Sequence, residues 1–407
     1  MEREGQNSMK IAIIGPKGLP IPPVKGGAVE TLVDCILLEN EKFKALEIDV
    51  YTIYDTDAIE ASQKYSMANF TFLSRNKIYT KYRDKLVSML RKVFRVTVTY
   101  TYARDLCKKI EGKNYDKVII EGDASLIIPI ANKIGKDRVY FHIHHNPLLT
   151  NHDEFRNEIS HCHKVIAVSD FIKNGIHKCM GNTAVICKVL KNCYRYDTNQ
   201  GNVKYTRQYF NLKEDDIVIS FSGRPIPDKG VKELLLAFKR LVREYSNIKL
   251  MIIGNPGFGN QVITDYQKEL EEIAQGLGDR VIFTGFISHN HMFEIYSLSD
   301  IGVVPSTYDD PAPLVVIECM ASGLPLVVTD SGGIPEYITP ECALMVTRNE
   351  NLVQNLEESL RYLIDNPKLR KEMSIKALNQ SSKFTEEAYY YNFLKILKNK
   401  GEKDDES

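Results

Sequence analysis

The chain contains 407 residues, of which 43% are hydrophobic and 26% are charged. This composition is typical of a globular protein and excludes a fibrous or wholly disordered chain. The chain is longer than one compact core usually serves, so we expect two domains of roughly 150–200 residues each. The 53 basic and 53 acidic residues cancel, which disfavours a dedicated nucleic-acid-binding protein.

Nothing in the sequence indicates membrane insertion or export. It has no apolar run long enough for a spanning helix, and the first segment, MEREGQNSMK, lacks the apolar stretch of a secretory signal. The 8 cysteines are scattered without a CxxC pair, a pattern typical of reduced thiols in the cytosol. We therefore expect a cytoplasmic protein.

In the first half of the chain, short apolar runs alternate with helical segments. The run Lys10–Gly15 predicts a buried strand, and a glycine-rich loop and a helix from near Ala28 follow it. Further strands are predicted at Ile48–Tyr54, Lys117–Ile120, Val139–Ile143, Val165–Val168 and Val185–Leu190. This alternation predicts a parallel, doubly wound α/β sheet.

A polar interval without clear periodicity, residues 192–212, separates this half from a second one. Strands are then predicted at Ile217–Phe221, Lys249–Ile253, Arg280–Phe283, Ile301–Val304 and Leu326–Thr329, and helices at Val231–Tyr245, Gln261–Gln275, 350–365, 367–380 and 385–398. Because open α/β sheets bind ligands at the carboxyl ends of their strands, we expect both domains to direct loops into one cleft between them.

The loop after the first predicted strand contains Gly26 and Gly27 at the start of a helix. Glycines let a backbone approach a ligand closely, and a helix N-terminus offers free N–H groups to a phosphate. An ordinary strand-to-helix turn would look similar. The loop is not GxGxxG, which disfavours a dinucleotide fold.

The segment SGRPIPDKG, residues 222–230, follows the first strand of the second half. The guanidinium of Arg224 can donate two hydrogen bonds to phosphate oxygens, and Lys229 supplies a mobile positive charge. Two cations at the carboxyl end of a strand suit a diphosphate, although two solvated surface charges are the alternative.

The most informative segment, residues 305–325, contains Asp310 and Glu318. A helix is predicted to begin near Leu314, so Asp310 lies on the preceding loop and Glu318 within the helix. Apolar residues flank Glu318 on both sides, which indicates partial burial, and an unpartnered buried carboxylate is costly. Ribose hydroxyls would satisfy it, each charged hydrogen bond contributing roughly 1.5–3 kcal/mol. An exposed glutamate on an amphipathic helix is the alternative.

Histidines concentrate where the strand Val139–Ile143 runs into a loop. Because strand neighbours point to opposite faces, His142, His144 and His145 cannot all converge on one ion, and no cysteine pair completes a zinc site. We expect no metal there, and favour a hydrogen-bonding role for one histidine.

Residues 75–109 are rich in lysine and arginine, with apolar residues interleaved. This pattern is typical of a basic amphipathic helix suited to an anionic membrane surface, and a solvated surface helix is an equal alternative.

Together these motifs resemble the retaining GT-B glycosyltransferases of family 4. The resemblance rests on the Gly-Gly loop, SGR…DKG at 222–230, FTGF at 283–286, the acid-x7-Glu spacing and TDSGGIPE at 329–336. It implies a GT-B fold of two Rossmann-like domains facing a deep cleft. The domains would be 1–200 on the acceptor side, 201–384 for the nucleotide sugar, and 385–407 as a helix crossing back, with its tail.

The resemblance also implies roles for individual residues. Glu318 would hold the nucleotide ribose, Asp310 would contact donor-sugar hydroxyls, and Arg224 with Lys229 would bind the donor diphosphate. Further donor contacts would come from Gly26, Gly27, Ile287, Leu314 and Val315. His144, or alternatively His145, would be the cleft histidine near the donor sugar.

Two positions depart from the family pattern. The first acid is Asp310 instead of a glutamate, and Pro313 replaces a glycine and therefore lacks an N–H. These changes affect the expected donor sugar more than the reaction.

The reaction implied is metal-independent transfer with retention from a nucleotide-diphosphate sugar, UDP favoured, with no cofactor. The sequence Asp55-Thr-Asp57 spells a DxD motif, but it lies away from the other motifs and we interpret it as chance. We expect a glycan or lipid-linked acceptor in polysaccharide or cell-envelope biosynthesis, such as capsule assembly, with the protein peripheral on the inner face of the plasma membrane. Nucleic acid is not an expected partner.

Two other functions fit the same motifs. A nucleotide-sugar 2-epimerase would bind the same donor without an acceptor. A non-catalytic, glycosyltransferase-like partner protein is the other, although the joint presence of Arg224, Lys229 and Glu318 disfavours it.

Overall fold

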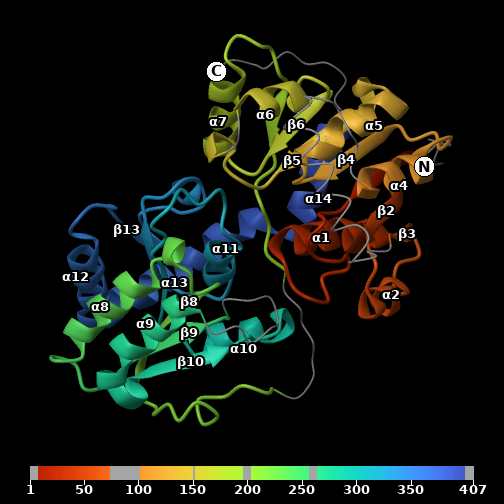
Figure 1. Cartoon of the computed structure of the whole chain (residues 1–407). Coiled ribbons are helices and arrows are strands. Elements are labelled where there is room, and N and C mark those ends of the chain that lie inside the picture. The colour runs from red at the N-terminus through yellow and green to blue at the C-terminus, as the bar shows by residue number, and fades with distance from the viewer. Residues whose placement is uncertain (1–7, 74–100, 150–151, 196–202, 256–263, 399–407) are drawn as a thin grey trace. The chain divides into compact units, whose positions relative to one another are not determined.

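A computed structural model of the chain describes residues 8–73, 101–149, 152–195, 203–255 and 264–398 (Figure 1). The chain forms two compact units, an N-terminal unit of residues 1–191 with 389–407 and a C-terminal unit of residues 192–388. The chain therefore changes unit at Asn192, in the polar interval, and again within its last described helix.

The N-terminal unit contains a seven-stranded sheet in the order β3-β2-β1-β4-β5-β6-β7, and every described pairing is parallel. Its strands are β1 (Met9–Ile14), β2 (Leu46–Ile53), β3 (Ala68–Leu73), β4 (Lys117–Glu121), β5 (Val139–Ile143), β6 (Lys164–Ala167) and β7 (Cys187–Val189). The strand order reverses between β1 and β4, so the loops after these two strands flank the position where such sheets bind ligands.

The described helices of this unit are α1 (Ala28–Phe43), α2 (Thr56–Ser62), α4 (Thr101–Ile110), α5 (Ile127–Ile134), α6 (His152–Ile159) and α7 (Asp170–Met180). Most of α1 is buried, including Leu32, Ile36 and Leu37. The backbone N–H of Lys44 then binds Asn40 O at 2.7 Å and ends the helix. Asp55, from the DxD sequence, caps α2 by accepting from the N–H groups of Asp57 and Ala58.

The last helix, α14 (Glu386–Lys398), joins the N-terminal unit from residue 389 onward. Tyr390 donates to Asn40 Oδ1 at 2.6 Å, and its ring stacks on Phe43 with centroids 5.8 Å apart. Lys164 Nζ donates to the carbonyl of Ile396 at 3.1 Å. Helix α14 is thus held by specific contacts with α1 and β6.

The C-terminal unit contains a six-stranded parallel sheet in the order β10-β9-β8-β11-β12-β13. Its strands are β8 (Ile217–Ser222), β9 (Ile248–Ile253), β10 (Val281–Gly285), β11 (Ile301–Val304), β12 (Leu326–Thr329) and β13 (Ala343–Val346). The order reverses between β8 and β11, which marks the loops after these strands as the expected ligand position.

Helices cover this second sheet (Figure 1). They are α8 (Val231–Leu241), α9 (Asp265–Ala274), α10 (Met292–Ser297), α11 (Leu314–Ala321), α12 (Leu352–Asp365) and α13 (Pro367–Ser381). Phe238 of α8, Leu250 of β9 and Leu356 of α12 are fully buried in one apolar cluster. Each described unit is therefore a Rossmann-like α/β domain, as predicted.

Several boundaries differ from the prediction. The strands β3 and β13, which lie at sheet edges, were not predicted. In β3, Asn69 and Thr71 interrupt the apolar residues, whereas β13 is a continuous apolar run of four residues that the sequence prediction missed. Strand β7 is shorter than the predicted Val185–Leu190, and α8 ends at Leu241 instead of Tyr245.

Two sequence expectations concern the membrane. Most of the basic segment 75–109 lies outside the described residues; its end, within Thr101–Ile110, is helix α4. Within the described part of the chain, no helix combines the length and apolarity needed to span a bilayer.

All eight cysteines are free of disulfide bonds.

Candidate functional site

The loop that carries Lys229 is fixed by close packing in the C-terminal unit. Gly230, which follows Lys229 and precedes α8, has φ +70°, and a Cβ there would lie 1.9 Å from the carbonyl oxygen of Pro305. Thr307 adds two bonds, from its N–H to Asp228 O at 2.9 Å and from its hydroxyl to Pro227 O at 3.1 Å. The segments after β8 and β11 are thereby held against each other.

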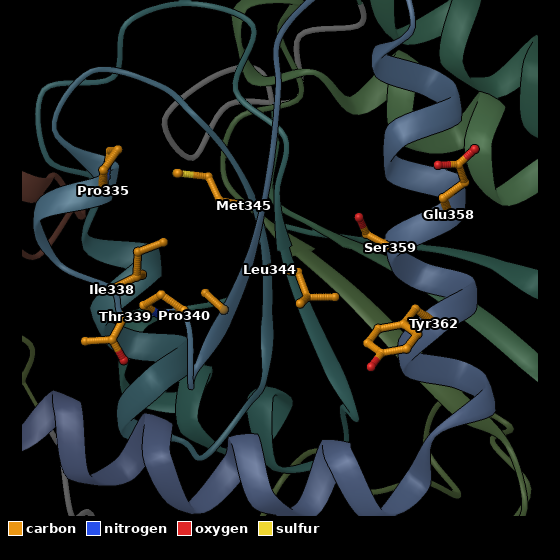
Figure 2. A pocket seen from close by; sticks show the side chains of 10 residues that line it. Pro335, Ile338, Thr339, Pro340, Leu344, Met345, Glu358, Ser359 and Tyr362 are labelled. Atoms are coloured by element: carbon orange, nitrogen blue, oxygen red, sulfur yellow. The ribbon is translucent and has the colours of Figure 1, made fainter.

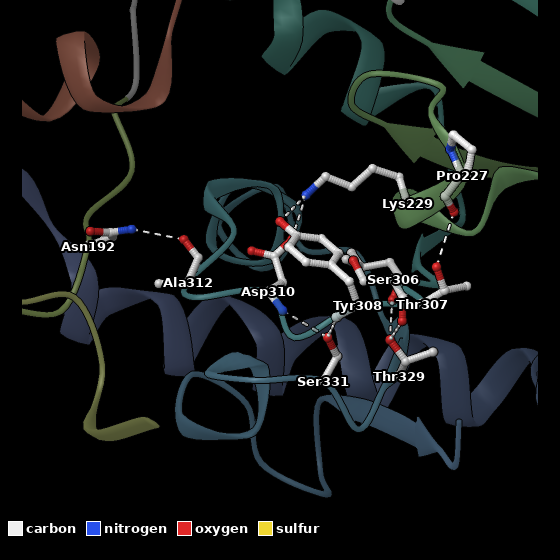
Figure 3. Close-up of polar contacts among 11 residues, drawn as sticks. Asn192, Pro227, Lys229, Ser306, Thr307, Tyr308, Asp310, Ala312, Thr329 and Ser331 are labelled. Atoms are coloured by element: carbon white, nitrogen blue, oxygen red, sulfur yellow. Dashed lines mark hydrogen bonds and ion pairs between the residues drawn. The ribbon is translucent and has the colours of Figure 1, made fainter. Parts of the chain in front are cut away.

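Lys229 and Asp310 form an ion pair at this junction (Figure 3). Lys229 Nζ lies 2.5 Å from Asp310 Oδ2 and 3.2 Å from the hydroxyl of Tyr308. Burial lowers the pKa of Lys229, but the charges and hydrogen bonds of Asp310 and Tyr308 outweigh burial and raise it above its usual value. The lysine is therefore a fixed, permanently charged group.

The loop around Asp310 is equally constrained. The residue is 4% exposed, its N–H binds Ser331 Oγ at 3.2 Å, and its carbonyl accepts from Gly333 N–H at 2.8 Å. A Cβ on Gly332 would lie 2.2 Å from that carbonyl oxygen. The residues of TDSGGIPE thus serve to position the loop that carries the first acid.

Glu318 forms the second polar centre, on α11. Its Oε1 lies 3.2 Å from His289 Nε2, and its Oε2 accepts from the Tyr296 hydroxyl at 2.9 Å. Burial raises the pKa of Glu318, but the contacts with His289 and Tyr296 outweigh burial and hold it below its usual value. With its side chain 15% exposed, Glu318 presents an ionised carboxylate at a partly open site.

The remaining predicted donor residues of this unit lie on the neighbouring loops. Arg224 is exposed on the loop after β8, and Ile287 is buried on the loop after β10. Leu314 and Val315 are the first two residues of α11, after Pro313, so their N–H groups lack partners within the helix. The unit therefore places cations, carboxylates and helix-start amides at the carboxyl ends of its strands.

In the N-terminal unit, Gly26 and Gly27 have φ values of +76° and +109° and precede α1. A Cβ on Gly27 would lie 2.1 Å from Glu30 Oε2. Burial raises the pKa of this Glu30 carboxyl to about 7, partly offset by a bond from its own backbone N–H, while Glu121 raises it further. Glu30 thus sits at the helix start for which the sequence left open a phosphate site or an ordinary strand-to-helix turn.

Three further polar side chains meet at the carboxyl ends of β4 and β5. Glu121 Oε2 lies 2.7 Å from His144 Nε2 and 3.0 Å from His142 Nδ1, and both Glu121 and His142 are 1% exposed. Burial and the neighbouring His142 lower the pKa of His144 to about 4, against the opposing effect of Glu121. Burial also lowers the pKa of His145, and the negative charge of Asp123 partly counteracts this lowering.

Among the described residues, Glu121, His142 and His144 are the group that could hold a metal, since their ligand atoms lie within 4.8 Å of one another. As predicted from strand alternation, His142 and His144 share a face, with ring centroids 4.1 Å apart, and His145 is outside the group.

The sequence analysis missed several polar residues that contact predicted ones, namely Glu30, Glu121, His289, Tyr296 and Tyr308. Glu121 had a usable signal, because it directly follows the apolar run of β4 at its carboxyl end. Tyr296 had none, because a tyrosine in an apolar helical pattern usually indicates core.

A separate apolar pocket of about 540 Å³ lies between β13 and α12 in the C-terminal unit (Figure 2). Leu344, Met345 and Tyr362 line it. It contains none of the predicted site residues, so it does not coincide with the candidate site.

Residues 203–380 match the family described as Glycosyl transferases group 1. The matched range lies within the C-terminal unit, residues 192–388. The matched range includes all the predicted C-terminal site residues, from Arg224 to Glu318.

Curated relatives extend the similarity. The chain is 30% identical over 226 residues to a lipopolysaccharide 1,2-N-acetylglucosaminetransferase of Salmonella typhimurium, a match that spans 55% of this chain and 59% of that protein. It is 25% identical to Spore coat protein SA of Bacillus subtilis, over 81% of this chain and 83% of that protein.

Solved structures share the fold over nearly the whole chain. Anabaena HepE in complex with UDP-glucose has a TM-score of 0.73 at 20% identity, covering 96% of this chain and 99% of that chain. Sucrose-phosphate synthase from Thermosynechococcus elongatus has a TM-score of 0.75 at 18% identity, covering 95% and 98%. With its two parallel-sheet domains, this chain has the GT-B fold that the sequence predicted.

Proposed function

We propose that this chain is a glycosyltransferase that moves a sugar from a nucleotide-diphosphate donor, with UDP favoured, to a glycan or lipid-linked acceptor. The observation that carries the proposal is the presence of Lys229, Asp310 and Glu318 at the strand ends of a unit that matches the group 1 family. The UDP and UDP-glucose complexes of HepE, which has the same fold, favour UDP.

Lys229 and Arg224 would bind the donor diphosphate. Negative charge develops on the leaving diphosphate as the glycosidic bond breaks, and cations already in place stabilise that charge without rearrangement. The ion pair with Asp310 keeps the Lys229 ammonium near one position. A diphosphate oxygen would share the lysine with Asp310, and the N–H groups at the start of α11 would add further donors.

Glu318 would accept the ribose hydroxyls of the nucleotide. Its present partners, His289 and Tyr296, keep it ionised and oriented. Hydroxyl donors from a ribose would bind an ionised acceptor in this partly enclosed site more strongly than a neutral one. Asp310 would contact hydroxyls of the donor sugar.

The proposed transfer retains the anomeric configuration and needs no divalent metal, because side-chain cations neutralise the leaving group. We propose that the leaving phosphate assists deprotonation of the acceptor, a route that requires no carboxylate nucleophile. Polysaccharide or cell-envelope assembly is the proposed setting, with the basic segment 75–109 drawing the protein to an anionic membrane surface.

The test combines donor turnover with product analysis. Purified protein in EDTA is given UDP-sugars alone and with glycan or lipid-linked acceptors, and the products are identified by mass and by anomeric NMR. Transfer or slow donor hydrolysis with retention supports the proposal. Conversion of the donor sugar to its 2-epimer, or no turnover of any nucleotide sugar, contradicts it.

The membrane proposal has its own test. Sedimentation with vesicles containing anionic lipid should show binding that weakens as salt is raised, because exposed charges are screened. Absence of binding at low salt would contradict the membrane part and leave the donor chemistry standing.

A further inference from the structure

The Glu121, His142 and His144 cluster is a buried polar group whose contacts define proton positions. Glu121 Oε2 contacts one nitrogen of each histidine, His144 Nε2 at 2.7 Å and His142 Nδ1 at 3.0 Å. The cluster lies at the carboxyl ends of β4 and β5, beside the point where the strand order reverses. That edge of the sheet is where such folds bind their ligands.

The charge state of the cluster follows from its contacts. Glu121 is 1% exposed, and its Oε2 faces the Nε2 atom of His144 at hydrogen-bond distance, which makes the carboxylate the acceptor of this contact. An ionised carboxylate only accepts hydrogen bonds. His144 Nε2, at 2.7 Å, is the nitrogen with hydrogen-bond geometry toward it, so this nitrogen carries the proton, whereas His142 Nδ1 lies at 3.0 Å without forming a hydrogen bond.

A neutral imidazole carries one N–H donor and one acceptor nitrogen. Because Nε2 of His144 donates to Glu121, Nδ1 is the acceptor nitrogen of the neutral ring. Within the described part of the chain, Nε2 has Glu121 as its partner and the side chain is 11% exposed. The ring of His142, 4.1 Å away, restricts rotation.

We propose that Glu121 is a positioning residue that fixes His144 as its Nε2–H tautomer, so that Nδ1 accepts a hydrogen bond from a sugar hydroxyl of the substrate. The inference deepens the proposed function and rests on it for the identity of that hydroxyl. It also decides between His144 and His145, because the Glu121 contact belongs to His144.

The tautomer itself is measured without any substrate. Full-length protein labelled with ¹⁵N-histidine is compared with its Glu121→Gln variant by NMR, and the His144→Asn spectrum identifies the resonances. We expect a single Nε2–H tautomer of neutral His144 in the native protein, and loss of that single form in Glu121→Gln. A native Nδ1–H tautomer, or an unchanged tautomer in Glu121→Gln, would overturn the proposal.

Activity then tests which nitrogen matters. In the His144→Asn variant the amide oxygen replaces Nδ1, whereas in His144→Gln the amide group reaches the position of Nε2. Donor turnover should therefore be higher in His144→Asn than in His144→Gln, and Glu121→Gln should lower it about tenfold, the effect of one hydrogen bond. Equal or reversed ranking of the two His144 variants would overturn the assignment of Nδ1.

A matched control separates positioning from general damage. Glu39 is a buried glutamate of α1, 2% exposed, that pairs with the exposed Lys42. Glu39→Gln should leave both the His144 tautomer and donor turnover unchanged. Calorimetry with UDP on the same proteins distinguishes the two proposals. If UDP does not bind, the proposed function is contradicted, whereas the tautomer of His144 is measured without substrate and is not affected by that result.

Discussion

The two units place their polar residues at equivalent edges of similar sheets, yet they differ in how the charges are used. In the C-terminal unit, Lys229 is paired with Asp310, and the second acid, Glu318, remains 15% exposed. In the N-terminal unit, the carboxylates Glu30 and Glu121 are almost fully buried. The first arrangement leaves charge partly exposed, whereas the second encloses it; we propose that the first binds the donor and that the second orients His144.

One type of sheet thus supports two kinds of chemistry at its strand ends. Buried carboxylates need partners, and Glu121 obtains them from two histidines. Glu30 instead becomes easier to protonate, because burial raises its pKa to about 7. Four substitutions test whether the two units differ in this way.

The largest effect is expected from Lys229→Met. Loss of a cation aimed at developing negative charge should lower kcat/KM for the donor by roughly 10²–10³-fold. Steady-state kinetics measures this, with Lys232→Met as the control, since Lys232 is a neighbouring, more exposed lysine paired with Glu269. Similar losses in both variants would remove the special role of Lys229.

Gly230→Ala tests whether close packing holds the Lys229 loop. A Cβ would lie 1.9 Å from the Pro305 carbonyl oxygen at a φ of +70°, so the free energy of unfolding should fall by about 2–4 kcal/mol. Gly276→Ala is the control, because no atom of the described residues lies within 4 Å of where its Cβ would stand. Chemical denaturation would show equal stability in the two variants if close packing does not hold the loop.

Glu30→Gln tests the buried carboxyl of the N-terminal unit. The folded-state pKa of about 7 exceeds the ordinary value of 4.5, so the native protein binds this proton more tightly than the unfolded chain. Glu30 therefore destabilises the fold increasingly as pH rises from 4.5 to 7, and fully above 7. Relative to native protein, Glu30→Gln should gain stability on the order of 2–3 kcal/mol at about pH 8.

The gain in Glu30→Gln should shrink as pH falls toward 4.5, where the native carboxyl is protonated in the folded state and increasingly so in the unfolded chain. Denaturation at a series of pH values measures it, with Glu60→Gln on the exposed side of α2 as the control. A gain that stays constant with pH would contradict the burial of an ionisable Glu30.

Glu318→Gln should have the smallest effect, weakening nucleotide binding about tenfold by replacing charged hydrogen bonds with neutral ones. Calorimetry with UDP measures the change, and Glu350→Gln, on an exposed loop, is the control. Unchanged affinity would mean that Glu318 serves only to anchor His289 and Tyr296.

Much of the fold could be predicted because its buried strands are continuous apolar runs. Val139–Ile143 and Ile301–Val304 have the bounds that the sequence predicts. The edge strand Ala68–Leu73 could not be placed this way, since it pairs on one side only and mixes polar with apolar residues.

The candidate site was predictable in part for a similar reason. Residues such as Lys229 and Glu318 stand in a dense local motif, whereas their partners come from other segments: Tyr308 contacts Lys229 from 79 positions away, and His289 contacts Glu318 from 29 away. Glu121 and His144 are 23 positions apart and meet because β4 and β5 are neighbours in the sheet. Pairings of this kind depend on strand order, which no local pattern specifies.

The proposed function depends above all on the binding of a nucleotide diphosphate by the C-terminal unit, through Lys229 and without a metal ion. The decisive experiment is calorimetric titration of UDP and other nucleoside diphosphates into the full chain in EDTA. We expect saturable binding of one nucleotide per chain and clear weakening in Lys229→Met. Binding that requires a divalent cation, or equal affinity in Lys229→Met, would contradict this mode of donor recognition.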